Sequence, residues 1–269
     1  ATSKPPRQPR SDTLPQQQSN MASYELAGRK VWLKKAAKRN SRLAYLPLTL
    51  MARWLNIEAL KPVPNLGGQE SVALEASRIK ALSAAGIAVP TILAETPDAL
   101  LLADAGSEDE PAATLLEKLT QAQTPGDIDQ LLNLGISALN DVHERSCYLS
   151  EAFARNILVN KDGVVFIDFE TNPGQVHELT DCMVRDWHCF IFSLYGKLSK
   201  RPLHRERLTA ALMDGLQATR DDVRERFLAT LPRLQRLQKI PFQRFGSDGK
   251  KIAHTLHALA LLNQHLRSK

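Results

Sequence analysis

The sequence has 269 residues, of which 43% are apolar, 24% are charged and 6% are aromatic, and its formal net charge at pH 7 is +6. A chain of this length can bury one large core or two modest ones, which excludes a disulfide-stapled miniprotein and a wholly disordered chain. No stretch approaches the ~18 consecutive apolar residues of a membrane-spanning helix, so we expect no such segment.

The cysteine pattern points to a reducing compartment. Cys147, Cys182 and Cys189 are too far apart for the short spacings of a zinc site or a redox motif, so we expect buried thiols. Residues 1–20 lack the apolar core of a secretory signal, and a cytoplasmic location is therefore expected.

Positive charge is concentrated at the front of the chain. Residues 1–61 contain twelve bases and three acids, a net charge of +9, whereas the remainder has 23 bases and 26 acids, a net charge of −3. A basic front end suits an anionic membrane surface, and peripheral contact with the inner face of a membrane is compatible with it. No nucleic-acid partner is expected, because aromatic side chains do not interleave with these bases.

Taken in chain order, the sequence predicts a strand-rich part followed by a helical part. Residues 1–22 are Pro-rich and basic with few large apolar side chains, so they predict a disordered tail. Short apolar runs bounded by turn residues predict strands at 24–26, 30–35, 87–93, 99–102, 157–159 and 164–167. Helical spacing predicts helices at 43–60 around Pro47, 69–85, 111–122, 127–144, and from 180 onward with interruptions at Pro202, Pro232, Pro241 and Gly246.

The hairpin predicted at 157–167 carries the clearest chemical signal. Asn156 directly precedes its first strand and Asp168 follows its second, so a turn at Asp162-Gly163 brings the two side chains together. With Glu151 one loop away, their oxygens make a plausible site for a hard cation such as Mg²⁺, whose shell a nucleotide's phosphates would complete. The alternative is that Asn156 and Asp168 only cap the strand ends.

A second signal comes from a helix and a strand. In the helix predicted at 69–85, Glu75 falls on the same face as apolar residues, so its carboxylate needs a cationic partner. The strand predicted at 30–35 offers Lys34 on one face and Lys35 on the other. Either lysine could pair with Glu75 and position an anionic ligand; the alternative is a surface Glu and a solvated Lys.

These residues resemble the protein kinase-like superfamily over residues 24–194. Val31-Trp-Leu-Lys34 looks like the strand that carries the nucleotide lysine, Glu75 like its helical partner, and Asn156 and Asp168 like the two metal ligands. The segments that resemble small atypical kinases, and in particular the lipopolysaccharide core and Kdo kinases of Gram-negative bacteria, are Gly86-Ile-Ala-Val-Pro90, Asp168-Phe-Glu170, Arg185-Asp186, Phe190 and Ser193-Leu194.

The resemblance implies a two-lobed α+β fold, with a small strand-rich N-lobe at 23–104 and a larger helical C-lobe at 105–269. It implies an ATP- and Mg²⁺-dependent phosphotransferase acting on a lipopolysaccharide core sugar or another hydroxyl acceptor, such as a membrane glycolipid. Lys34, or Lys35, and Glu75 would position ATP, and Asp186 would support the catalytic loop, while His143 and His177 are expected to be structural.

Two departures from the family pattern bear on activity. Counting back from Asn156, the position of the usual catalytic Asp holds Glu151, preceded by Leu149 where the family has His, and no glycine-rich loop precedes Lys34. Glu keeps the carboxylate but shifts its oxygens by on the order of 1 Å, which can cost ~10²-fold in rate. A pseudokinase, which binds a nucleotide or a partner with impaired transfer, is therefore the alternative function.

Overall fold

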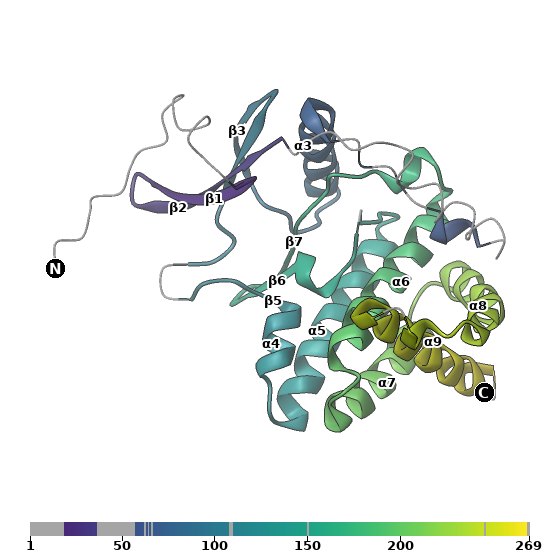
Figure 1. Ribbon diagram of the computed structural model, residues 1–269. Coiled ribbons are helices and arrows are strands. Elements are labelled where there is room, and N and C mark those ends of the chain that lie inside the picture. Colours follow the sequence, from purple (N-terminus) through teal and green to yellow (C-terminus); the bar gives the residue numbers. More distant parts are fainter. Residues whose placement is uncertain are drawn as a thin grey trace.

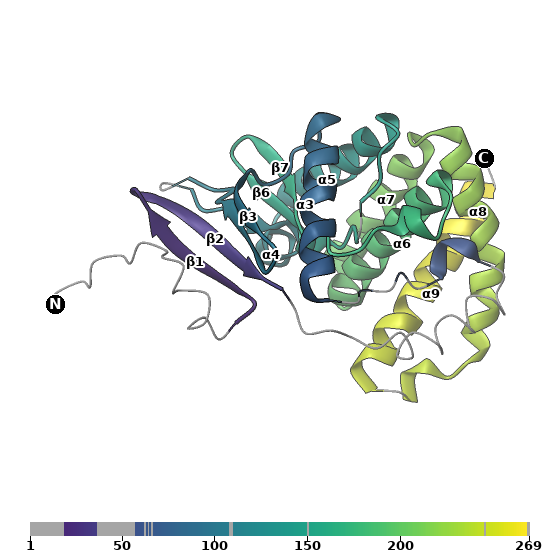
Figure 2. The ribbon, with the colours of Figure 1, turned by 90° about the horizontal axis from the view of Figure 1, so that it is seen from above.

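The computed structural model describes residues 19–36, 57–61, 63, 65, 67–107, 110–149, 151–244 and 246–267. Over these residues the fold is α+β: a small antiparallel sheet from the N-terminal part lies beside a larger, mainly helical remainder (Figures 1 and 2). The predicted α+β class and the order of strands before helices are thus confirmed. None of the described helices combines the length and the apolar character that crossing a bilayer requires.

The first sheet consists of four strands in the spatial order β1-β2-β4-β3, and every neighbouring pair is antiparallel. The strands are β1 (Met21–Leu26), β2 (Arg29–Lys35), β3 (Ile92–Thr96) and β4 (Ala99–Ala103). Ala27 and Gly28 connect β1 to β2 with φ of 49° and 75°, and positive φ at both positions is what a type I′ hairpin turn requires. Because β2 is paired on both sides, its backbone is held between β1 and β4, and this sets which face of the sheet each of its side chains is on.

Helix α3 (Gly68–Ala84) comes between β2 and β3 in the chain, and it lies between the sheet and the helical remainder (Figure 2). Its buried face contains Val72, Glu75, Ile79 and Leu82, as the helical spacing predicts. Gly86 follows the helix with φ of 77°, a conformation that favours glycine, and thereby confirms the predicted end.

A second, three-stranded sheet contacts α4 and α5. It has the order β5-β6-β7 and is formed by β5 (Ala113–Thr114), β6 (Ile157–Asn160) and β7 (Gly163–Phe166). The predicted hairpin at 157–167 is therefore confirmed as β6 and β7, with Asn160 opposite Gly163 at the turn.

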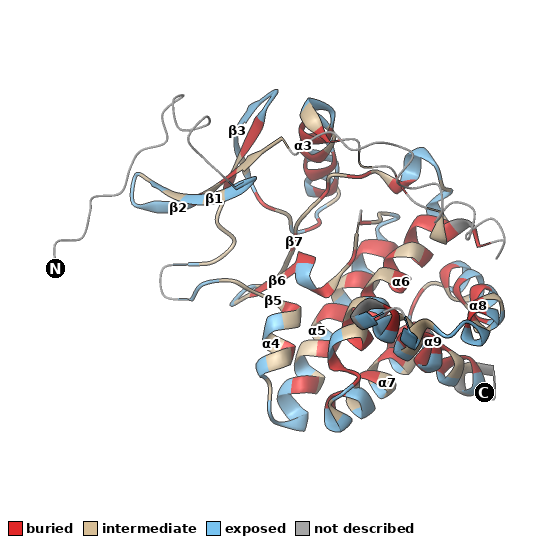
Figure 3. Cartoon of the chain, in the orientation of Figure 1, coloured by how far each residue is buried: buried red, intermediate tan, exposed pale blue. Residues whose placement is uncertain are grey.

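The helical remainder is built around α5 and α6, whose inner faces are buried (Figure 3). Trp187 and Phe190 of α6 are fully buried and meet edge to face. The helices and short 3₁₀ turns are η2 (Glu58–Leu60), α4 (Leu115–Gln121), α5 (Pro125–Glu144), η3 (Ala154–Asn156), η4 (Pro173–Gln175), α6 (Leu179–Leu198), α7 (Pro202–Gln217), α8 (Asp221–Gln235), η5 (Arg236–Lys239), η6 (Phe242–Arg244) and α9 (Gly246–Arg267).

The structure corrects the strand predicted at 87–93. Its N-terminal half is not a strand, because the Ile87 N–H donates to the Leu82 carbonyl (3.0 Å) and completes the last turn of α3. Pro90 has no N–H to contribute to a sheet, and β3 begins only at Ile92.

Other boundaries differ as well. The helix predicted at 111–122 begins at Leu115, because Thr114 and Glu117 form a capping box there, and 113–114 pair with β6 instead. Pro232 does not interrupt α8, since one missing N–H near the end of a helix removes a single backbone hydrogen bond. The predicted tail ends before residue 21, where β1 begins.

Some predictions fall outside the described residues: the tail up to residue 18 and the helical segment 43–56. All three cysteines are free thiols, Cys182 being buried and Cys147 and Cys189 half-buried.

Candidate functional site

The centre of the candidate site is the ammonium group of Lys34. From β2 it contacts the carboxylates of Glu75 on α3 (2.9 Å), Asp168 after β7 (3.0 Å) and Glu170 two residues further on (3.0 Å). A lysine ammonium has three N–H donors, and three carboxylates surround this one. The sequence left Lys34 and Lys35 as alternatives; Lys34 meets the predicted partners, whereas Lys35 alternates to the other face of β2.

Glu75 is held as the helical spacing predicts, on the apolar face of α3 with 3% of its surface exposed. Its carboxylate contacts Lys34 and accepts a hydrogen bond from the Phe169 backbone N–H (3.3 Å). Burial raises the pKa of Glu75 above its usual value, against the opposing effect of Lys34. Burial alone would lower the pKa of Lys34, but the surrounding carboxylates outweigh it and the pKa is raised.

Asn156 and Asp168 lie side by side at the end of the β6–β7 hairpin, as predicted. The Asn156 amide nitrogen donates to the Glu151 backbone carbonyl (3.1 Å) and lies 3.4 Å from an Asp168 carboxylate oxygen. Asp168 has φ of 73°, a left-handed conformation that Asp tolerates better than most residues. That backbone geometry turns its carboxylate toward Lys34 and Asn156 rather than continuing the strand.

Glu151 lies on the loop before η3, and its side chain is 34% exposed. Burial raises the pKa of its carboxyl, and the negative charge of Asp168 adds to this, while Arg185 and Arg155 oppose it. The Arg155 guanidinium is 3.9 Å from the Glu151 carboxylate. The raised pKa is the property expected of a group that accepts and releases a proton.

A buried carboxylate of α6 supports the loop that carries Glu151. Asp186 of α6 is fully buried, accepts a hydrogen bond from the Leu149 N–H (2.8 Å) and lies 3.2 Å from a ring nitrogen of His143. His177 contacts the Lys61 carbonyl (3.2 Å). Asp186 thus contacts the backbone of the loop that it was expected to support, and each histidine has one polar contact within the protein.

A cavity of about 400 Å³ lies between the first sheet and the β6–β7 hairpin. Its polar wall contains the four predicted residues Lys34, Glu75, Asn156 and Asp168, whereas Lys35 and Glu151 are not among the described residues that line it. The apolar wall comes from both sheets and includes Trp32, Ile79, Leu102, Leu158 and Ile167. One charged end and one apolar end suit a ligand with an anionic part and a flat apolar part.

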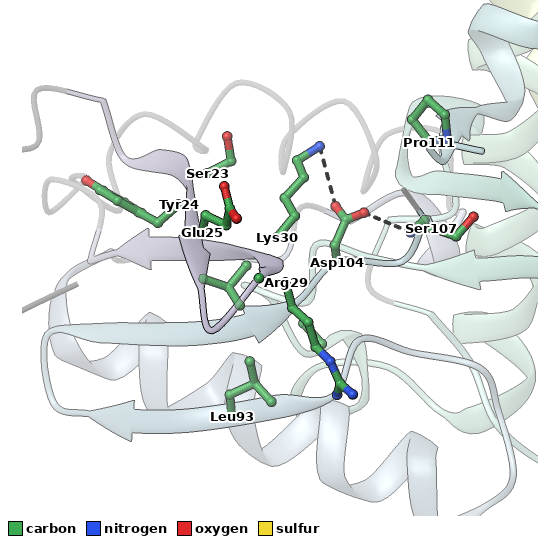
Figure 4. A pocket seen from close by; sticks show the side chains of 13 residues that line it. Ser23, Tyr24, Glu25, Arg29, Lys30, Leu93, Asp104, Ser107 and Pro111 are labelled. Atoms are coloured by element: carbon green, nitrogen blue, oxygen red, sulfur yellow. Dashed lines mark hydrogen bonds and ion pairs between the residues drawn. The ribbon is translucent and has the colours of Figure 1, made fainter. Parts of the chain in front are cut away.

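A larger, open cavity of about 930 Å³ adjoins the first near the β1–β2 turn (Figure 4). Lys30, Ala103 and Asp104 line both cavities. Lys30 lies 3.6 Å from the Asp104 carboxylate, which also accepts a hydrogen bond from the Gly106 N–H (3.0 Å), so a charged pair marks the boundary between the cavities.

Glu170 and Asp104 were missed as site residues. Glu170 follows Asp168 by two positions, but the left-handed φ of Asp168 interrupts the extended backbone, so strand alternation could not have indicated it. Its second oxygen accepts a hydrogen bond from the Asn65 amide (2.7 Å), a contact over 105 positions that no local pattern reveals.

Asp168 and Asn156 are too few to hold a magnesium ion by themselves, but they suit a magnesium ion that is also bound by phosphates. No group of three or more His, Cys, Asp or Glu in the described part of the chain is arranged to hold a metal by itself. Asp168 and Asn156 offer two oxygen donors, and Mg²⁺ usually takes one or two protein ligands together with substrate phosphates. The residues present therefore fit a nucleotide-bound magnesium ion.

The sequence matches no protein-family model and no curated protein.

Proposed function

We propose that the protein is an ATP- and Mg²⁺-dependent phosphotransferase with a protein kinase-like two-lobed fold. In this proposal residues 23–104 form the N-lobe, residues 105–269 form the C-lobe, and the 400 Å³ cavity lies between them. One observation carries the proposal: Lys34, Glu75, Asp168 and Asn156, drawn from three distant parts of the sequence, converge in one cavity.

Phosphoryl transfer mainly needs groups that position the phosphates and stabilise their negative charge, and these four residues are of that kind. Glu75 fixes the Lys34 ammonium, and Lys34 holds the phosphates of the nucleotide. Asp168 and Asn156 would hold magnesium, whose charge offsets that of the phosphates. The apolar wall of the cavity excludes water from the other end of the ligand.

Glu151 has the role of orienting the acceptor hydroxyl and accepting its proton. Its raised pKa supports this role, because a base with a pKa closer to the working pH exchanges protons more effectively. Asp186 keeps the loop in place through the Leu149 N–H.

We propose a hydroxyl acceptor, such as a lipopolysaccharide core sugar on a membrane glycolipid, and a cytoplasmic protein in peripheral contact with the inner membrane. The net charge of +9 over residues 1–61 supports contact with anionic lipid headgroups.

A pseudokinase is the second candidate, and one observation favours it. Lys34, Glu75, Asn156 and Asp168 all line the cavity, but Glu151 does not, and its loop carries Leu149 where a bracing histidine is expected. In this alternative the site binds a nucleotide and transfers phosphate poorly.

Calorimetric titration of ATP with and without Mg²⁺ tests the shared part of both proposals. We expect Mg²⁺-dependent binding to the wild type, loss of the metal dependence in Asp168→Ala, and no change in the control Asp162→Ala at the exposed hairpin turn. Absence of ATP binding to the wild type would refute both proposals.

Phosphate release or transfer then separates the two candidates. A phosphotransferase loses at least ~10²-fold in rate in Glu151→Ala with little change in ATP affinity. A rate that is equally low in the wild type and in Glu151→Ala would identify a pseudokinase.

A further inference from the structure

The basic side chains of the helical remainder are concentrated in two segments. Residues 197–205 and 233–257 together contain ten Lys or Arg and a single acid, Asp248, a net charge of +9. The other residues from 62 to 269 contain 13 Lys or Arg and 25 Asp or Glu, a net charge of −12. Because the charges are separated in this way, the two segments carry a positive potential. Eight of the ten bases are exposed: Lys197, Lys200, Arg205, Arg236, Lys239, Arg244, Lys250 and Lys251.

Helix α9 packs against both α6 and α8 and so brings the two segments together (Figures 1 and 2). The Lys251 side chain lies against Gly196 of α6, where an added Cβ would be 3.5 Å from the Lys251 Cβ. One turn further along, the Ser199 hydroxyl lies 3.1 Å from a ring nitrogen of His254. The end of α6 and the first half of α9 therefore present their bases side by side.

The turn η5 extends this surface. The Gln238 amide donates to the Leu256 carbonyl of α9 (3.0 Å), so the neighbouring Lys239 lies close to the same helix. We call the exposed side of residues 196–201, 236–244 and 250–257 the C-terminal basic surface.

An apolar element lies within this surface, between η5 and η6. Ile240 is 37% exposed, Pro241 is exposed, and the exposed bases Lys239 and Arg244 flank the two. An apolar side chain between bases suits the boundary between lipid headgroups and acyl chains. There the apolar atoms leave water while the cations remain beside phosphates.

Nucleic acid also presents phosphates, but it suits this surface less well. A nucleic-acid backbone has no apolar layer beneath its phosphates into which Ile240 could insert. No Phe, Tyr or Trp is exposed in the described part of the two segments, so single-stranded bases find no ring on which to stack. The C-terminal basic surface therefore fits an anionic bilayer.

We propose that the C-terminal basic surface docks the protein on a membrane, with its bases on anionic headgroups and Ile240 inserted among them. The inference rests on the membrane contact in the proposed function, which it assigns to a folded part of the chain and not to residues 1–61 alone. It does not require phosphoryl transfer.

Sedimentation of the full chain with lipid vesicles tests the inference. We expect binding to vesicles of phosphatidylcholine mixed with phosphatidylglycerol and none to phosphatidylcholine alone. One base near an anionic surface is worth about 1 kcal/mol, or about fivefold, so Lys200→Gln/Lys239→Gln should lower the partition coefficient roughly 25-fold at ~0.1 M salt. The control Lys80→Gln/Lys161→Gln removes the same charge from exposed positions on α3 and at the β6–β7 turn, and should stay within about twofold of the wild type.

A second variant, Ile240→Ser, tests insertion separately from charge. It should weaken binding to the anionic vesicles by at least about threefold, both at ~0.1 M and at ~0.5 M salt, because salt does not screen apolar contacts. The loss caused by the lysine pair should instead shrink at ~0.5 M salt. All substituted side chains are exposed, and unchanged circular dichroism would confirm that each variant is folded.

Each contrary result overturns a stated part of the inference. Equal losses in the two lysine pairs would mean that binding follows net charge alone, and no loss in either would assign membrane contact to residues 1–61. Unchanged binding in Ile240→Ser would overturn the insertion. Binding to a DNA duplex but not to vesicles, lost in Lys200→Gln/Lys239→Gln, would identify a nucleic-acid surface. Calorimetry with ATP and Mg²⁺ on the same proteins reports separately on the proposed nucleotide site, so failure of one is distinguishable from failure of the other.

Discussion

Replacing Lys34 by methionine should destabilise the fold by about 3–5 kcal/mol at neutral pH. The lysine side chain is only 13% exposed and that of Glu75 only 4%, so solvent screens their interaction little. Methionine keeps most of the apolar stem, so the loss reports mainly the removed charge. Without the ammonium, Glu75, Asp168 and Glu170 face one another as like charges.

The loss should depend on pH in a defined direction. Burial raises the pKa of Glu75, and removal of Lys34 removes the main effect that lowers it. A carboxyl group whose pKa is higher in the folded than in the unfolded state favours folding at low pH, and this contribution is lost as pH rises through the folded-state pKa. The difference in free energy of unfolding between the wild type and Lys34→Met should therefore grow from about pH 5 to about pH 8.

Urea unfolding followed by circular dichroism at both pH values measures this difference. At pH 8 the double variant Lys34→Met/Glu75→Gln should be more stable than Lys34→Met, because the unpaired buried charge has been removed. Lys80→Met, on the exposed side of α3 and paired with Glu95, is the matched control and should cost no more than about 1 kcal/mol. A Lys34→Met protein within 1 kcal/mol of the wild type at pH 8, or a pH-independent difference, would refute the reasoning.

Three further predictions concern neighbouring groups. Glu170→Ala frees one N–H of the Lys34 ammonium, so in the presence of a chelator triphosphate should bind several-fold more tightly by calorimetry; unchanged or weaker binding contradicts this. Asp186→Ala leaves the buried Leu149 N–H without its acceptor and should lower the free energy of unfolding by about 1–3 kcal/mol, measured in urea, with a wild-type value as the contrary result. Burial raises the pKa of Cys182 and of Cys189 to about 12, so at pH 8 a thiolate-specific reagent should label them at least ~100-fold more slowly in the native than in the unfolded protein. Equal labelling rates would show that these thiols are accessible.

The local parts of the fold were predictable because local chemistry determines them. The β1–β2 and β6–β7 hairpins follow from their turn residues, and α3 follows from its apolar spacing and from Gly86. The strand predicted at 87–93 was wrong in its first half because Ile87 suits either a strand or the end of a helix. Ile87 is apolar enough for a strand, yet its N–H completes the end of α3, and only the structure shows which use prevails.

In the candidate site, too, local contacts could be predicted from the sequence and long-range contacts could not. Asn156 and Asp168 are twelve positions apart and are joined by a single hairpin, so their meeting could be inferred from the sequence. The choice of Lys34 over Lys35 depends on which face of β2 turns toward Glu75 of α3, and alternation along a strand does not indicate which face that is. Glu170 joins the cluster through a lysine 136 positions away, which periodicity cannot reveal.

Glu151 does not line the cavity, which favours the pseudokinase, but its electrostatic environment favours phosphotransfer. A carboxylate that had lost its role would be expected on an open surface, yet Glu151 is two-thirds covered, and burial and Asp168 together raise its pKa. Arg185 and Arg155 oppose that rise. A module that only binds a ligand needs no proton acceptor beside Asp168, whereas proton transfer from an acceptor hydroxyl requires such a group.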